Sequence, residues 1–515
     1  MRSEYVNTMS DVLTVLGKHQ LICFTLDGAT NLRGKQIINM MACVPNAFFL
    51  EHFTRESAAN LLEKLLNCKL RLLTCSIREP AHGCRLSRMP DALPNDDDNY
   101  DNHHAVAGAA AIGLNNNLGP PPPDTLCSRN EHFVNPPMLA LCSDSPSVMT
   151  KLRRECLASN EFMFAYGCSP HAIHNLCMDL VKLFAGVKLA LEEVLYMVKT
   201  LKSSHLLLQL CDKLCLEKYK TTYTLILFTK TRWGTVFYFA QRATRVKAAC
   251  AALPREILNS DLDIDMCKEL KQLLTDPVYW KRVASMDALF KTIASCLTHL
   301  EGDEATFSLV YVSFVAIKYP LRKLDASVRE GLSLNDDDLD HMMALTHHRF
   351  STIYTEVHAL AFATDPLFMG MRTRIADEFG EAFLQLGKGP LISKSKVDLS
   401  RLANGDENVR QKMYSEFGTP YIRACRDDNS IDFEDTAMKP SELWTLCDDS
   451  EYGSIKYLLC SVHRNLAGAS GGERNHKGCN VCGVLSLVQC EQGWARPTSR
   501  AALPFSSMQN SLTGS

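Results

Sequence analysis

The chain has 515 residues, of which 46% are hydrophobic and 22% charged, and its formal net charge at pH 7 is −3. This length gives room for roughly three domains of ordinary size, and the composition excludes wholesale disorder. The small net charge argues against nucleic-acid binding through bulk positive charge, although a local basic face stays open. The 21 cysteines are scattered among apolar residues, which favours reduced thiols inside a cell. The N-terminus lacks a signal-peptide pattern and no run of about 18 apolar residues occurs, so we expect a nuclear or cytoplasmic protein without a membrane span.

The stretch 21–50 predicts three short strands. Apolar runs at 21–26, 37–44 and 47–50 are separated by turns that contain Gly, Asn and Pro, which is typical of an antiparallel meander. The first run ends on Asp27. A carboxylate at the end of a central strand is costly to bury unless it is paired or binds a metal, so Asp27 is the first candidate for chemistry. The alternative is an ordinary turn residue at a strand end.

The next segments continue an α/β pattern with one interruption. Leucines at helical spacing predict a helix after Ser57, a plausible N-cap, which completes a first half-domain over residues 1–77. Residues 78–137 are rich in Asp, Asn, Gly and Pro, and we expect a disordered low-complexity insertion there. An apolar strand at 138–142 then leads to Asp144, and Ser145-Pro146 opens a helix.

The remainder of the chain is predicted to be mostly helical. A strand at 162–166 belongs with the second half of the α/β core, for which we expect the bounds 138–185. Residues 186–436 are expected to form a helical insertion domain, with long amphipathic runs at 194–219 and 333–366. A C-terminal segment, 437–478, contains Glu473, and residues 479–515 are expected to form a disordered tail. The expected fold class is therefore α/β, with a core domain interrupted by a large all-α insertion.

Three acids suggest a common site. Asp27 and Asp144 lie at the ends of two predicted strands, and Glu473 lies beside small residues that permit close packing. Two-metal phosphoryl transfer needs such a trio, because carboxylates hold two divalent ions about 3.5–4 Å apart. Mg²⁺ prefers oxygen ligands and keeps several waters, so few protein groups suffice, and Mn²⁺ is an alternative. Spacing alone is weak support, because the chain has 58 acidic residues.

Five short motifs resemble those of hAT-superfamily transposases and of the transposase-like domain family related to them. FTLDGATNLRGKQIINMMA resembles the T-x-D-G-W-T opening, and CSDSPSVMTKL resembles the second motif, a strand that ends in T-D-N/S. YGCSPHAIHNL resembles C-x-x-H-x-x-x-L, FTKTRWGT resembles the R-W motif of the helical insertion, and GASGGERN resembles S-S-A-x-S-E-R of the C-terminal dimerisation region. They occur in family order over residues 21–477. The resemblance implies an RNase H-like catalytic domain split by a helical insertion.

The resemblance also assigns roles to individual residues. It implies that Asp27, Asp144 and Glu473 are catalytic metal ligands of a DDE triad. Trp233 matches the tryptophan that stacks on DNA at the transposon end, and Arg232 would hold a phosphate. From the residues alone, Trp233 is equally a core aromatic side chain, and Arg232 is equally a partner for a surface carboxylate.

Cys168 and His171 allow two interpretations. Cys-x-x-His is a legitimate spacing for a zinc pair, but a tetrahedral site needs a second pair, and none is obvious nearby. The other interpretation, which we favour, is a structural motif at a helix start with His171 hydrogen-bonded near the acidic site.

The expected function is DNA strand cleavage and transfer by a hAT transposase-like protein, acting as a homodimer or higher oligomer. The sequence departs from the family at Ala29, where tryptophan is usual, and no N-terminal BED zinc finger precedes the first motif. We therefore expect a relic or domesticated copy. One alternative is an inactive DNA- or protein-interaction module that dimerises through its helical and C-terminal regions. Another is an RNase H-like nuclease unrelated to transposition.

Overall fold

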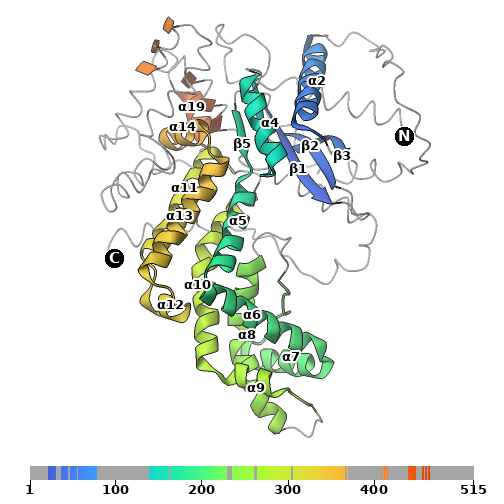
Figure 1. Cartoon of the computed structure of the whole chain (residues 1–515), viewed down its shortest axis with the longest axis vertical. Helices are drawn as coiled ribbons and strands as arrows, with labels where there is room; N and C mark the ends of the chain where they lie inside the picture. The colour runs from blue at the N-terminus through green and yellow to red at the C-terminus, as the bar shows by residue number, and fades with distance from the viewer. Residues whose placement is uncertain are drawn as a thin grey trace, which may run out of the picture.

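A computed structural model describes most of residues 21–77 and 138–368 and short pieces between 407 and 463. The described residues are 21–30, 36–43, 47–54, 56–77, 138–159, 162, 164–228, 235–259, 264–302, 305–365, 368, 407–408, 411–412, 414–415, 439–447, 455–456, 459–460 and 462–463. They form an α/β structure in which a small mixed sheet precedes a long series of helices (Figure 1).

The sheet has five strands in the order β3-β2-β1-β4-β5. Its strands are β1 (Leu21–Thr30), β2 (Gln36–Cys43), β3 (Ala47–Thr54), β4 (Met138–Ser143) and β5 (Phe164–Gly167). The first three pair antiparallel, which confirms the predicted meander. β4 pairs parallel to β1, and β5 pairs parallel to β4, so β1 is the middle strand and β4 lies between it and the edge strand β5.

One face of the sheet is purely apolar. Successive side chains of a strand point to opposite faces, so Ile22, Phe24 and Leu26 share one face of β1. They pack with helices α2 (Ala58–Ile77) and α4 (Ser147–Ala158), which stand beside the sheet in Figure 1. Ser57 precedes α2 and its Oγ accepts a hydrogen bond from the Asn60 backbone, as the N-cap prediction requires.

The opposite face of the sheet meets the helical region. Cys23 of β1, Cys142 of β4 and Tyr166 of β5 belong to the core that continues into the helices. The helices of this region are α5 (Ser169–Leu183), α6 (Ala185–Ser203), α7 (His205–Tyr219), α8 (Thr235–Leu258), α9 (Lys268–Thr275), α10 (Pro277–Leu300), α11 (Phe307–Arg322), α12 (Ala326–Gly331), α13 (Asp336–Ile353) and α14 (Glu356–Thr364). Figure 1 shows α5 leading away from the sheet into this bundle.

Two helical runs that the periodicity predicts as continuous are each divided. The 194–219 run breaks at Ser204, which has an extended backbone. The Ser204 hydroxyl oxygen caps α7 by accepting a hydrogen bond from the Leu207 amide. The 333–366 run breaks at Tyr354 and Thr355 between α13 and α14. The apolar spacing continues across both breaks, so periodicity alone does not reveal them, whereas the polar capping residues do.

Part of the C-terminal segment packs against α14. Trp444, in α19 (Pro440–Leu446), donates its indole N–H to the Thr364 carbonyl oxygen, 2.9 Å away. His463 Nε2 lies 3.0 Å from Thr364 Oγ1. Because α14 also borders β5 through the Tyr166 and His358 rings, this segment lies on the β5 side of the sheet. Among the described helices, none has the length and apolar character needed to cross a bilayer.

Candidate metal centre

Asp27, Asp144 and His171 meet at the end of the two central strands. One potential ligand atom from each residue lies within 4.8 Å of the other two. Asp27 is 2% exposed and Asp144 is 7% exposed, while His171 is half-buried. The structure thus brings together the first two acids of the predicted trio, together with the histidine of the Cys-x-x-His motif.

The register of the sheet brings Asp27 and Asp144 together. Leu26 of β1 pairs with Ser143 of β4 in the parallel ladder, and the next residues along the two strands are Asp27 and Asp144. Asp27 shares the face of Cys23 and lies opposite the apolar face of Leu26, so its carboxylate faces the helical region. A parallel pair of strands therefore delivers two carboxylates to one end and one face of the sheet.

Gly28 allows the two strands to approach at this point. A Cβ atom on Gly28 would lie 3.2 Å from Asp144 Oδ2, so a larger side chain would press on the carboxylate. The Gly28 backbone amide also hydrogen-bonds Asp144. The Asp-Gly pair of the first motif therefore has a local packing reason as well as a chemical one.

Asp144 keeps one carboxylate oxygen unsatisfied. Its Oδ1 atom is buried and accepts no hydrogen bond from the part of the chain that the structure describes. Burial raises the pKa of Asp144 to about 6, the charge of Asp27 raises it further, and His171 and the Gly28 amide act in the opposite direction. A buried carboxylate in this state is strongly attracted to a cation.

Arg153 of α4 fixes the backbone beneath Asp144. Its Nη1 atom donates to Ser143 Oγ at 2.8 Å and to the Asp144 carbonyl oxygen at 2.7 Å. Burial lowers the pKa of Arg153, and the nearby Cys142 and Asp144 partly oppose this. The guanidinium thus holds the end of β4 through the backbone, while the Asp144 side chain is left for another partner. Sequence reasoning missed Arg153, although a charged residue between Leu152 and Cys156 on an apolar helix face was a usable signal.

His171 enters the site from the first turn of α5. Cys168 is the N-cap residue of this helix, and His171 Nε2 lies 3.9 Å from Asp27 Oδ1. Burial lowers the pKa of His171, but Cys168 and the two acids outweigh it and raise the pKa to about 9. Burial of Cys168 raises its thiol pKa, but hydrogen bonds with Cys142 and His171 bring it well below its usual value. Cys168 is not in the group of converging ligand atoms found in the described residues, whereas His171 is.

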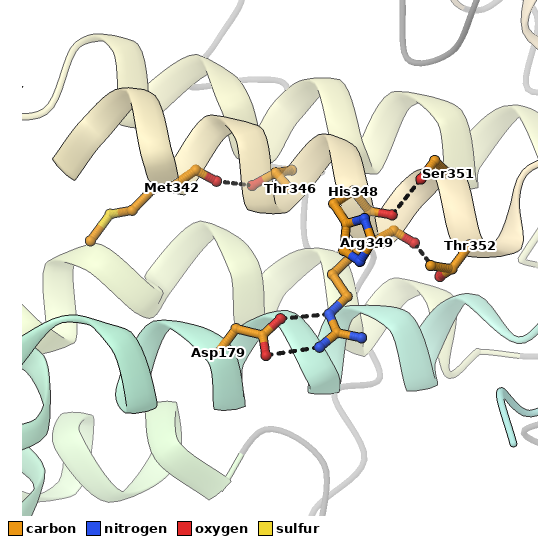
Figure 2. A network of polar contacts seen from close by, with 7 residues as sticks. All are labelled: Asp179, Met342, Thr346, His348, Arg349, Ser351 and Thr352. Carbon is orange, nitrogen blue, oxygen red and sulfur yellow. Dashed lines mark hydrogen bonds and ion pairs between the residues drawn. The ribbon is translucent and has the colours of Figure 1, made fainter. Parts of the chain in front are cut away.

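The position of α5 is fixed by α13. Asp179 and Arg349 form a two-pronged ion pair, with Arg349 Nε donating to Asp179 Oδ2 at 2.6 Å and Nη2 donating to Oδ1 at 2.8 Å (Figure 2). At the β5–α5 corner, a Cβ atom on Gly167 would lie only 3.0 Å from the Ile353 Cα atom. The ion pair joins α5 to α13 beyond the midpoint of α5, and the close approach at Gly167 leaves no room for a side chain at the corner where α5 begins.

Three predicted site residues lie outside the described residues: Glu473, Trp233 and Arg232. The predicted insertion at 78–137 and the predicted tail at 479–515 also lie there. Their sequence-based roles stay predictions.

No protein-family model matches the chain, and no curated protein matches it.

Proposed function

We propose that this chain is a hAT transposase-like protein, with an RNase H-like core interrupted by the helical region, that acts on DNA in the nucleus. The observation that carries the proposal is the parallel pairing of β1 with β4, which delivers Asp27 and Asp144 to one face of the sheet end. An antiparallel meander, a helix, and then a strand parallel to the first is also how the expected core begins.

The donor set fits a divalent cation. Asp27 and Asp144 supply carboxylate oxygens, and the unsatisfied Asp144 Oδ1 is a buried anionic atom that lacks a partner among the described residues. Mg²⁺ or Mn²⁺ would be held by these two acids and, by resemblance, by Glu473. When bound, such ions activate an attacking hydroxyl and stabilise the leaving oxygen of a phosphodiester.

The protein's own residues would position this chemistry. Arg153 holds the backbone of Asp144, Gly28 leaves room for its carboxylate, and Arg349 of α13 pairs with Asp179 of α5. The packing of Trp444 and His463 on α14 supports a return of the C-terminal segment towards the sheet, as a role for Glu473 requires. By resemblance, Trp233 would stack on an unpaired base and Arg232 would bind a phosphate, in a homodimer or higher oligomer.

The test is cation-dependent nicking of supercoiled DNA by the full chain. Asp27→Asn and Asp144→Asn should each abolish nicking in Mg²⁺ or Mn²⁺, because the site loses the charge that binds the cation. Asp337→Asn, an exposed acid at the start of α13, is the matched control and should nick at the wild-type rate. Nicking that survives in Asp144→Asn would refute the proposed mechanism.

A second candidate is an interaction module that binds DNA or protein and dimerises without catalysis. It is favoured by the position of His171, whose Nε2 atom lies 3.9 Å from Asp27 Oδ1. A protonated His171 would offset one of the two carboxylate charges and help hold the sheet end together without a cation. Such a module would bind DNA or self-associate with no nicking and no calorimetric response to Mg²⁺ or Mn²⁺.

A further inference from the structure

We propose that His171 is itself a ligand of the bound cation, and that the site therefore selects first-row transition-metal ions over Mg²⁺. This inference rests on the proposed function, in that it assumes that Asp27 and Asp144 hold a divalent ion. It goes beyond that function because it changes the donor set from carboxylates alone to two carboxylates and an imidazole.

The distances fit a shared ion. Two ligand atoms that are each about 2.1 Å from one ion lie at most about 4.2 Å apart. The 3.9 Å between His171 Nε2 and Asp27 Oδ1 falls inside that limit, and the 4.8 Å within which all three candidate atoms converge exceeds it slightly. Small side-chain adjustments therefore suffice for all three residues to contact a single ion.

A second observation points to a ligand at this place. Asp144 is 7% exposed, and its Oδ1 atom has no hydrogen-bond partner in the described residues. A buried anionic oxygen without a donor among the described residues is costly, and a bound cation would offset that cost. One carboxylate oxygen of each acid lies within 4.8 Å of a His171 ring nitrogen, so a cation between the two acids also comes within reach of His171.

The chemistry of the donors sets the preference. Mg²⁺ demands oxygen ligands in near-ideal octahedral geometry and loses its waters reluctantly. Imidazole nitrogen instead favours borderline ions, and affinity rises from Mn²⁺ towards Zn²⁺ at a given nitrogen and oxygen site. We therefore expect the order of affinity Zn²⁺, then Mn²⁺, then Mg²⁺.

The experiment uses the full chain, freed of metal with a chelator and then titrated by calorimetry with Mn²⁺, Zn²⁺ and Mg²⁺ in turn. Pulsed electron paramagnetic resonance of the Mn²⁺ form detects a coordinated nitrogen directly. The variants are His171→Gln, which replaces the nitrogen with an amide, and Asp144→Asn, which tests the site as a whole. His174→Gln is the matched control, because His174 lies one turn further along α5 and does not belong to the converging group.

We expect the wild-type protein to bind Mn²⁺ at least about tenfold more tightly than Mg²⁺ and to give a nitrogen coupling. His171→Gln should weaken Mn²⁺ and Zn²⁺ binding by about 10- to 100-fold, change Mg²⁺ binding less, and remove the coupling, while His174→Gln should change none of these.

Two failures are distinguishable. If Mn²⁺ binding depends on Asp144 but the wild-type spectrum has no nitrogen coupling, the His171 inference is overturned and the proposed function stands. If neither Mn²⁺ nor Mg²⁺ binds the wild-type protein, the proposed function falls as well. The wild-type spectrum decides the question even where His171→Gln fails to fold.

Discussion

The two faces of the central sheet are built from the same strands and serve different purposes. On β1, Ile22, Phe24 and Leu26 face α2 and α4 and form a continuous apolar layer. The alternate residues Cys23 and Asp27 face the helical region, where thiols, a tyrosine hydroxyl and carboxylates replace aliphatic groups. One face provides stability, and the other places polar groups where burial makes them costly unless they are used.

The apolar face should respond most strongly to mutation. Phe24→Ala removes a fully buried ring from the layer between β1 and the α2–α4 pair and should cost about 3–5 kcal/mol in the free energy of unfolding. Denaturant unfolding followed by circular dichroism measures this cost. Leu70→Ala, on the exposed side of α2, is the control and should stay within about 0.5 kcal/mol of wild type. Equal costs for the two variants would mean that Phe24 does not anchor a buried apolar layer.

The polar face should instead respond to cations. Because a cation binds the folded site and not the unfolded chain, Mn²⁺ at about 100 times its dissociation constant should stabilise the wild-type protein by about 2.7 kcal/mol. Asp144→Asn should lose this increment, and it should not destabilise the cation-free protein, because it removes a buried charge that has an unsatisfied oxygen. Thermal unfolding with and without Mn²⁺ tests both statements. A Mn²⁺ increment of equal size in Asp144→Asn would place the cation elsewhere.

Arg153 connects the two faces, because it belongs to a helix of the apolar layer and bonds the backbone of Asp144. Arg153→Met should cost about 2 kcal/mol, since it leaves buried carbonyl oxygens without their charged donor, and it should weaken Mn²⁺ binding as well. Arg154→Met is the matched control, because Arg154 is the exposed neighbour on the same helix. Unfolding and calorimetry on the two variants give the comparison. Normal Mn²⁺ affinity in Arg153→Met would mean that Asp144 holds its position without this support.

The local sequence pattern predicts most of the strands of the sheet, but it does not predict the pairing of β4 with β1. The alternation and turns of residues 21–50 predict the meander, and the apolar run before Asp144 predicts β4. The pairing of β4 with β1 is a contact between segments more than a hundred residues apart, and no local signal encodes its register. The resemblance to a known family supplied the expectation that Asp27 and Asp144 meet.

The site itself was predictable only in part. Asp27 and Asp144 carry a strand-end signal, and the interpretation favoured from the sequence already placed His171 near the acidic site. The convergence of its ring nitrogen with both carboxylates depends on how α5 leaves β5. The breaks at Ser204 and Thr355 also escaped the periodicity, because capping is decided by one polar side chain and the apolar spacing is decided by many. The sequence pattern therefore does not predict features that depend on long-range packing or on a single hydrogen bond.

The helical side of the polar face gives the smallest expected effect, a loss of stability in acid. His358 of α14 is fully buried among rings that include Tyr166 and Phe307, and burial lowers its pKa to about 4. In the unfolded chain the histidine pKa is near 6.5, so between pH 4 and pH 6.5 the unfolded chain binds more protons than the folded chain. Stability from this group is therefore fully present above pH 6.5 and is lost as the pH falls towards 4, by about 1–2 kcal/mol between pH 7.5 and 5.

His358→Gln isolates this contribution from the local helix geometry. The His358 ring accepts a hydrogen bond from the Thr355 amide at 3.1 Å at the start of α14, and glutamine at the third helical position supports the same capping arrangement. The variant should fold at pH 7.5 and show a shallower decline of unfolding free energy between pH 6.5 and 4. His463, whose pKa burial lowers to about 3, keeps part of the slope in the variant. An unchanged slope in His358→Gln would assign the acid sensitivity to other groups and would leave the helical side of this face without a titrating contribution from α14.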